Sequence, residues 1–238
     1  MKADWRTLSL CFILFGCTTV GIPDKEAMEN IDFGPPETLR ICIYKDVDIS
    51  DQQADDIIAA LQQEFSRFDL EIEVPWVKPW KRPAFSSDEI LNNFASCPLE
   101  APCDRLLALV GRNFGDFLWG IIMPEIHGYV EVVSMTKGLA VAEIGSFNQI
   151  LGMSSATRTA IHETYHLLGC DHDLDAKSCY QKIAFVKKIA RKSRLGGSDF
   201  FPSVTLDQRV LRSRLDVDKK LKPFLNHTHS CITISRKN

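Results

Sequence analysis

The pattern of apolar and polar residues along the chain predicts a succession of strands and helices. The segment Leu39–Tyr44 alternates in the manner of a strand. Ser50, with Gln53 three positions later, forms a capping box that predicts the start of a helix. The apolar stripe of that helix is made by Ala54, Ile57, Ile58, Leu61 and Phe65. Further strands are expected at Leu70–Val77 (ended by Pro79), Leu106–Val110, Tyr129–Met135 and Leu139–Ile144, with Thr136-Lys137-Gly138 as the turn between the last two.

Helical periodicity dominates the second half of the chain. Helices are expected at Ser87–Phe94, Ser155–Leu168, Lys182–Arg194 and Thr205–Leu221. The last would begin at a second capping box, Thr205 with Gln208. The helix at Lys182–Arg194 is strongly basic, which favours a solvated face, with contact to anionic lipid head groups as the alternative. This order of elements predicts an α/β (α+β) fold.

The N-terminus has the features of an export signal. Lys2 and Arg6 precede an apolar run, Leu8–Phe15, which is too short to span a bilayer. The run ends in Leu14-Phe15-Gly16-Cys17, which resembles a bacterial lipobox, and this implies lipidation at Cys17; an ordinary signal peptide cut near Gly16 is the alternative. We therefore expect a signal peptide at 1–16, Cys17 with a flexible tether at 17–37, and one domain at 38–238.

This N-terminus predicts a lipoprotein of the bacterial cell envelope, attached to a membrane through its lipid. Thr18 follows Cys17, where an aspartate would favour the inner membrane, so the outer membrane is the expected location. The net charge of -3 gives no indication of nucleic-acid binding.

Cysteine usage agrees with export. Of eight cysteines, Cys11 falls in the signal and Cys17 on the lipid, which leaves an even set for disulfides. Six cysteines allow 15 pairings. The pairing we expect is Cys97 with Cys103, Cys170 with Cys179, and Cys42 with Cys231.

The stretch from His162 to His172 carries the chemistry, and it follows the pattern HExxHxxGxxH. His162 and His166 are four apart, so a helix places both imidazoles on one face, where they can bind one metal ion. Gly169 allows a left-handed turn that ends the helix, after which His172 can supply a third ligand. Glu163 lies beside the ligands and can serve as a general base.

These residues resemble the metzincin clan of zinc peptidases. The resemblance implies one zinc ion on His162, His166 and His172, Glu163 as the base, an upper subdomain of twisted mixed sheet and helices, and a smaller C-terminal subdomain. Asp173 after the third histidine is as in the adamalysin/reprolysin branch.

The chain departs from the clan in one respect, because every methionine precedes His172. The clan has a methionine in a turn beneath the zinc. Archaemetzincins place it in a Cys-x-Met, and here Cys179-Tyr180-Gln181 offers Gln181 in that place. Archaemetzincins also bind a second zinc through a CxxC, which this sequence lacks, so we expect one zinc.

The expected function is a zinc metallopeptidase acting on peptide or protein substrates. The resemblance implies that the substrate pairs with a sheet edge, which we expect at Gly138, Leu139, Ala140 and Val141, and Tyr180 is a candidate to stabilise the oxyanion. One alternative is an aminopeptidase of archaemetzincin type, for which Glu143 is the candidate amine-binding residue. The other is an inert zinc-containing surface lipoprotein.

Overall fold

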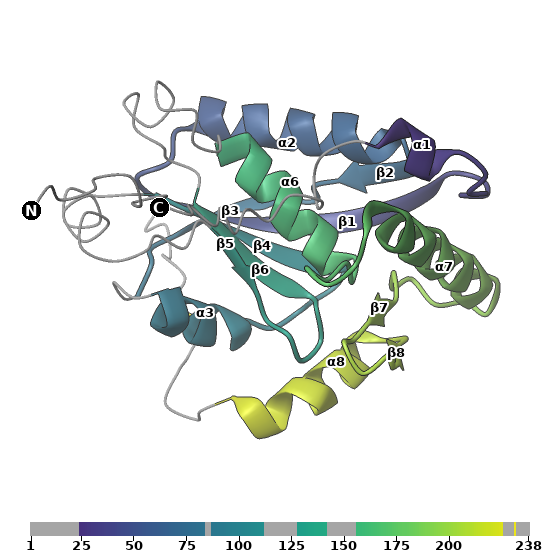
Figure 1. Cartoon of the computed structure of the whole chain (residues 1–238). Helices are drawn as coiled ribbons and strands as arrows, with labels where there is room; N and C mark the ends of the chain where they lie inside the picture. Colours follow the sequence, from purple (N-terminus) through teal and green to yellow (C-terminus); the bar gives the residue numbers. More distant parts are fainter. Residues whose placement is uncertain (1–23, 84–86, 112–127, 142–155, 226–230, 232–238) are drawn as a thin grey trace, which may run out of the picture.

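The centre of the computed structural model, which describes residues 24–83, 87–111, 128–141, 156–225 and 231, is a mostly parallel sheet (Figure 1). Its strands run in the order β2-β1-β4-β6-β5. Strand β3 pairs with the second half of β1, and β2 pairs with the first half. Among these pairs only β5 with β6 is antiparallel. The strands are β1 Glu37–Asp46, β2 Leu70–Glu73, β3 Val77–Trp80, β4 Arg105–Val110, β5 Gly128–Val130 and β6 Lys137–Val141.

Helices cover both faces of this sheet (Figure 1). They are α1 Lys25–Met28, α2 Asp51–Ser66, α3 Ser87–Ala95, α6 Ala156–Leu167, α7 Ala176–Leu195 and α8 Arg214–Leu221, with a 3-10 turn η1 at Lys222–Phe224. A small hairpin, β7 Ser203–Val204 with β8 Val210–Leu211, precedes α8. The molecule is therefore a mixed α/β structure with a helical layer on each side of the sheet.

Alternation along β1 divides the core into two clusters, one on each face of the sheet. Leu39, Ile41 and Ile43 pack into the cluster that includes buried residues of α2, α6 and α7, which we call the first face. Cys42 and Tyr44 pack with residues of α3 and α8 on the other side, the second face. Period-two alternation directs successive side chains to opposite faces, so both faces of this central strand are buried.

Several expected elements are confirmed. The alternating segment Leu39–Tyr44 lies within β1, and the run Leu106–Val110 lies within β4, where every residue is buried. Both hydrogen bonds of the capping box between Ser50 and Gln53 are present at the start of α2. The expected helices at 87–94 and 155–168 correspond to α3 and α6, and the one expected at 182–194 lies within α7, which begins six residues earlier than expected, at Ala176 after the cap residue Asp175.

Two expected strand boundaries are wrong. Leu70–Val77 is not one strand: β2 and β3 pair with successive parts of β1, and Pro79 lies inside β3. Tyr129–Met135 stops at Val130, because the buried Glu131 carboxylate accepts hydrogen bonds from the main-chain N–H groups of residues 133, 134 and 136 and folds them into a turn. The expected turn residues 137 and 138 instead begin β6.

The expected capping box at Thr205 is also wrong. The Thr205 hydroxyl accepts a hydrogen bond from the Arg209 main-chain N–H at 3.1 Å and helps to close the turn between β7 and β8. Helix α8 begins later, where the Ser213 side chain accepts from the Asp216 N–H. The same residue types stabilise turns and helix starts, so the local pattern did not separate the two.

One expected disulfide is present and two are wrong. Cys170 is bonded to Cys179 as expected, whereas the other bonds are Cys42–Cys103 and Cys97–Cys231. Cys42 and the chain entering β4 are neighbours because β1 and β4 pair, with Cys42 opposite Leu106. The pairing therefore follows the strand order, which the spacing of the cysteines does not reveal.

The segment expected to be a flexible tether is partly packed onto the domain. Ala27, Met28, Ile31 and Phe33 contact the core of the first face, and the Phe33 ring lies 5.2 Å from that of Phe68. The expected signal peptide and Cys17 lie outside the described residues. Over the part of the chain that is described, no helix is both long and apolar enough to cross a membrane.

Candidate metal centre

Three histidines converge at the C-terminal end of α6. His162 and His166 lie one turn apart on this helix, and Gly169, with φ of +89°, turns the chain so that His172 returns toward them. Their ligand nitrogens lie within 4.8 Å of one another, close enough to hold a metal ion. The sequence-predicted ligand set is thus brought together in space.

His166 is the most enclosed member of the cluster. Its Nδ1 lies 2.5 Å from the Cys170 carbonyl oxygen, and its Nε2 lies 3.0 Å from Nε2 of His162. Burial lowers the pKa of His166 to about 4, although the hydrogen bond to Cys170 acts in the opposite direction. If Nδ1 donates to the carbonyl, Nε2 carries the lone pair that a metal ion needs.

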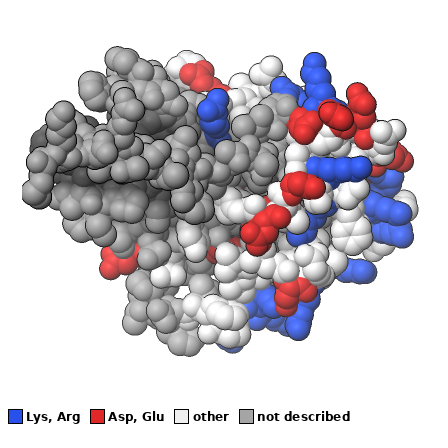
Figure 2. Space-filling model, viewed as in Figure 1, with Lys and Arg blue, Asp and Glu red and all other residues white. Residues whose placement is uncertain are grey.

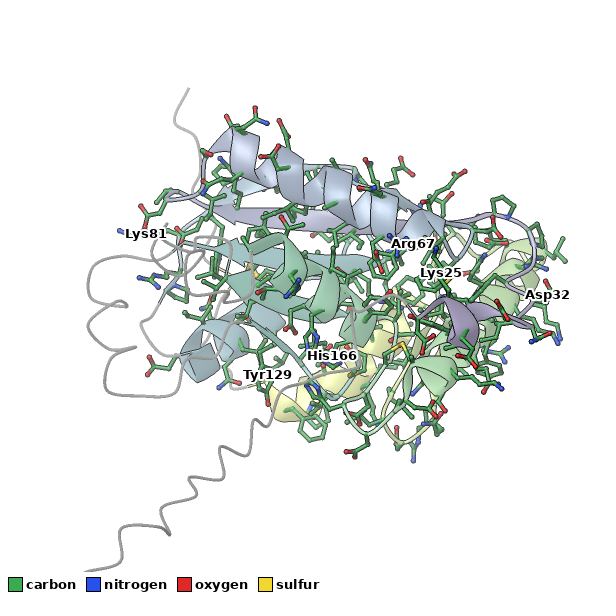
Figure 3. The ribbon with its side chains drawn as sticks, turned by 45° about the horizontal axis from the view of Figure 1, so that its top comes forward. Lys25, Asp32, Arg67, Lys81, Tyr129 and His166 are labelled. Atoms are coloured by element: carbon green, nitrogen blue, oxygen red, sulfur yellow. A yellow bond between two sulfur atoms is a disulfide. The ribbon has the colours of Figure 1, made fainter. Side chains whose placement is uncertain are left out.

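Glu163 follows His162 on α6 but turns toward the sheet. It is only 4% exposed, and burial raises the pKa of its carboxyl group to about 8. A Cβ atom built on Gly128 would lie 2.3 Å from Oε1 of Glu163, so the carboxyl group lies against the main chain of β5. Figure 3 shows His166 of α6 and Tyr129 of β5 in this part of the molecule.

Among the described strands, β5 and not β6 lies at the edge of the sheet near the histidines. Strand β6 pairs with β4 on one side and β5 on the other, so the expected substrate edge at Gly138, Leu139, Ala140 and Val141 is wrong. The hydrogen bond from Glu131 N–H to the Lys137 carbonyl fixes the alternation in this antiparallel pair. By that alternation, the main-chain N–H and C=O groups of Gly128 and Val130 point away from β6.

The structure describes two further residues expected near the metal. The side chain of Gln181 is exposed on α7. The Tyr180 hydroxyl accepts a hydrogen bond from the Asp24 N–H at 3.1 Å, and its ring packs 5.1 Å from that of Phe68. Glu143, the candidate for binding a substrate amine, lies outside the described residues.

A buried arginine that the sequence analysis missed supports the end of α6. The Arg105 guanidinium donates to the carbonyl oxygens of Leu167, Phe201 and Pro202 at 2.9, 3.0 and 2.7 Å. Burial lowers the pKa of Arg105 to about 10, against the opposing effect of Asp104. A charged residue that opens an apolar strand was the available signal, since such a group is buried only when it is well hydrogen-bonded.

Charges of both signs are interspersed over the described part of the face in Figure 2. Some of the basic side chains of α7 bind groups of the protein itself. Arg191 and Arg194 pair with Glu37, and Lys187 donates to the buried Phe68 carbonyl at 2.5 Å.

Comparison with known proteins adds no relative. No family model matches the chain, and the search of curated proteins finds no match.

Proposed function

We propose that this protein is a zinc-dependent peptidase. The observation that carries the proposal is the cluster of three imidazoles within 4.8 Å, with a carboxylate on the same helix that is not one of its members. Three nitrogen ligands are typical of catalytic zinc sites, which keep a fourth position for water, whereas structural sites use four protein ligands, often cysteines. The cysteines Cys170 and Cys179 near this cluster are consumed in a disulfide.

Each residue of the centre has a distinct task in the proposed reaction. His162, His166 and His172 would hold the metal, which when bound supplies Lewis-acid activation of water and of the scissile carbonyl. Glu163 would accept a proton from the attacking water and deliver it to the leaving amine nitrogen. Its raised pKa of about 8 suits a group that must both accept and return a proton near neutral pH.

The proposed substrate is an extended peptide that adds to β5. The outward main-chain groups of Gly128 and Val130 provide the hydrogen-bonding pattern of a sheet edge, next to the carboxyl group of Glu163. Tyr129 between them is 39% exposed and can contact a substrate side chain. Export is part of the proposal, and the three disulfides support it because they are typical of oxidising compartments. Lipidation at Cys17 is proposed from the sequence alone.

The test compares wild type with Glu163→Gln on a peptide library, with zinc content measured in both. We expect Glu163→Gln to keep its zinc and to lose at least about 100-fold in cleavage rate, the effect of losing a general base. Glu71→Gln, at an exposed position on β2, is the matched control and should cleave like wild type. Equal cleavage by wild type and Glu163→Gln would rule out the proposed base.

The alternatives are separated by the same library. Cleavage confined to peptides with a free N-terminus would identify an aminopeptidase. A wild-type protein that holds zinc but cleaves nothing would favour the inert zinc protein.

A further inference from the structure

The connection between α6 and α7, residues 168–175, carries the third histidine and is closed by a disulfide. Cys170 lies two residues before His172, and Cys179 lies in the early part of α7. Their bond closes residues 170–179 into a covalent ring, and His172 is one of the residues in that ring. The disulfide therefore limits how far this histidine can move from the two on α6.

The same cysteine contacts a second ligand through its main chain. The Cys170 carbonyl lies 2.5 Å from Nδ1 of His166, so it sets the orientation of that ring. The Cys170 N–H donates to the Tyr165 carbonyl at 3.1 Å, which ties it to the last turn of α6. One residue thus influences both a helical ligand and the loop ligand.

The other hydrogen bonds that we identify in this loop are local. The His172 N–H donates to the Asp171 side chain, the Leu174 N–H donates to the Asp171 carbonyl, and the Asp175 side chain caps α7. Such short-range bonds shape the loop but do not anchor it to the rest of the molecule. The side chain of His172 is itself exposed.

Helix α7, in contrast, is firmly anchored. Ile183 and Val186 are buried in the core of the first face, and Cys179 is 2% exposed. The disulfide joins this anchored helix to the ligand loop. Because Cys170 is also fully buried, thiol reagents reach the bond poorly, and it acts as a permanent brace.

We propose that the Cys170–Cys179 disulfide is a positioning element of the metal centre, which holds the Cys170 carbonyl against His166 and keeps His172 within ligand distance. The proposal rests on the proposed function in that zinc is taken as the metal. Groups that orient metal ligands from behind typically contribute 10- to 100-fold to metal affinity.

The test measures zinc affinity by competition with a chromophoric chelator, using the folded oxidised protein. The variant is Cys170→Ala with Cys179→Ala, and the matched control is Cys42→Ala with Cys103→Ala, which removes a buried disulfide on the second face. We expect the first variant to bind zinc about 10- to 100-fold more weakly than wild type. The control should lose thermal stability but keep wild-type affinity.

A second readout separates positioning from general loosening. In a His172→Ala background, removal of the Cys170–Cys179 disulfide should weaken zinc binding much less than it does when His172 is present. The reason is that His172, the main ligand that the disulfide positions, is then absent. Equal zinc affinity of the brace variant and wild type would overturn the proposal, as would an equal loss in the control.

These outcomes are distinct from those of the peptidase test. If the wild type binds zinc but does not cleave peptides, the proposed function fails, and the proposed role of the Cys170–Cys179 disulfide still stands. If the wild type is active but its zinc affinity does not depend on the Cys170–Cys179 disulfide, only this inference fails. If the wild type binds no zinc, both proposals fail.

Discussion

The two faces of the central sheet are covered by different means. The first face is packed by α2, α6 and α7, whose apolar stripes meet a continuous cluster of aliphatic and aromatic side chains. The second face is covered by the shorter helices α3 and α8. There the Cys42–Cys103 bond joins β1 to the connection between α3 and β4, and the Cys97–Cys231 bond joins that connection to the segment after α8. The metal centre lies on the face that is stabilised by helix packing.

Buried polar groups contribute to both faces. On the second face, the Lys137 ammonium group donates to the Ala95 and Cys97 carbonyls at 2.6 Å, and burial lowers its pKa to about 8. The cover there depends on such specific bonds and on covalent links. The first face combines a larger apolar cluster with a disulfide, Cys170–Cys179, and a buried lysine, Lys187, and it carries the three histidines at its margin.

Two consecutive residues, Asp104 and Arg105, form hydrogen bonds to elements on opposite faces of the sheet. Asp104, fully buried, accepts from Arg40 at 3.0 Å and lies 3.5 Å from Arg214. Arg105 extends to the other side, to the carbonyl of Leu167 at the end of α6. Arg105 therefore joins β4 of the sheet to the end of α6, the helix that carries His162 and His166.

The largest expected effect comes from Arg105→Met, which removes this connection. The change leaves the carbonyl oxygens of Leu167, Phe201 and Pro202 without their buried donor, so we expect the free energy of unfolding to fall by about 3–5 kcal/mol. Urea unfolding measures it. Arg209→Met, at a side chain that is 72% exposed, is the control and should change stability by less than about 0.5 kcal/mol. A small loss at Arg105 would show that the two faces are not coupled there.

A smaller loss is expected from Cys97→Ala with Cys231→Ala. This bond spans 134 residues, and removing it should lower the free energy of unfolding by about 2–4 kcal/mol, chiefly by freeing the unfolded chain. Amide hydrogen exchange in the native state should accelerate in α3 more than in α6. Equal acceleration in both helices would contradict the division of the molecule into two differently stabilised faces.

The confirmed predictions on the first face rest on local signals. The Ser50 capping box, the stripe of α2 and the histidine spacing each lie within a few turns of chain, where helical geometry determines which residues meet. The Cys170–Cys179 bond shares this property, with a sequence separation of 9.

What the sequence could not reveal depends on contacts between distant segments. Cys42 meets Cys103 because β1 and β4 are neighbours, and β5 lies at the edge of the sheet as described because it folds back onto β6, an order that spacing alone does not specify. Glu131 ended β5 early through hydrogen bonds from its own turn, and no alternation pattern reports such a carboxylate. The support of α6 by Arg105 likewise requires segments 62 positions apart to meet.

The smallest expected effect, and the most specific to the proposed chemistry, is that of Gly128→Ala. The added Cβ would lie 2.3 Å from Oε1 and 2.5 Å from Cδ of Glu163, so the carboxyl group must move away from β5. The three atoms nearest to the added Cβ all belong to Glu163 and not to a histidine, so zinc affinity should stay at the wild-type value. Because catalysis depends steeply on the position of the base, cleavage should fall at least about tenfold, which corresponds to about 1.4 kcal/mol in the barrier.

Two further variants sharpen the result. Gly196→Ala, at the C-terminal cap of α7, adds the same methyl group away from the centre and should leave cleavage unchanged. Glu163→Ala in the Gly128→Ala background removes all three Glu163 atoms that would lie within 2.6 Å of the added Cβ, so part of the stability lost on adding the methyl group should return. If Gly128→Ala cleaves as fast as wild type while zinc is retained, the edge strand does not position Glu163. The functional part of the first face would then end with helix α6 and its loop, and β5 would serve the sheet alone.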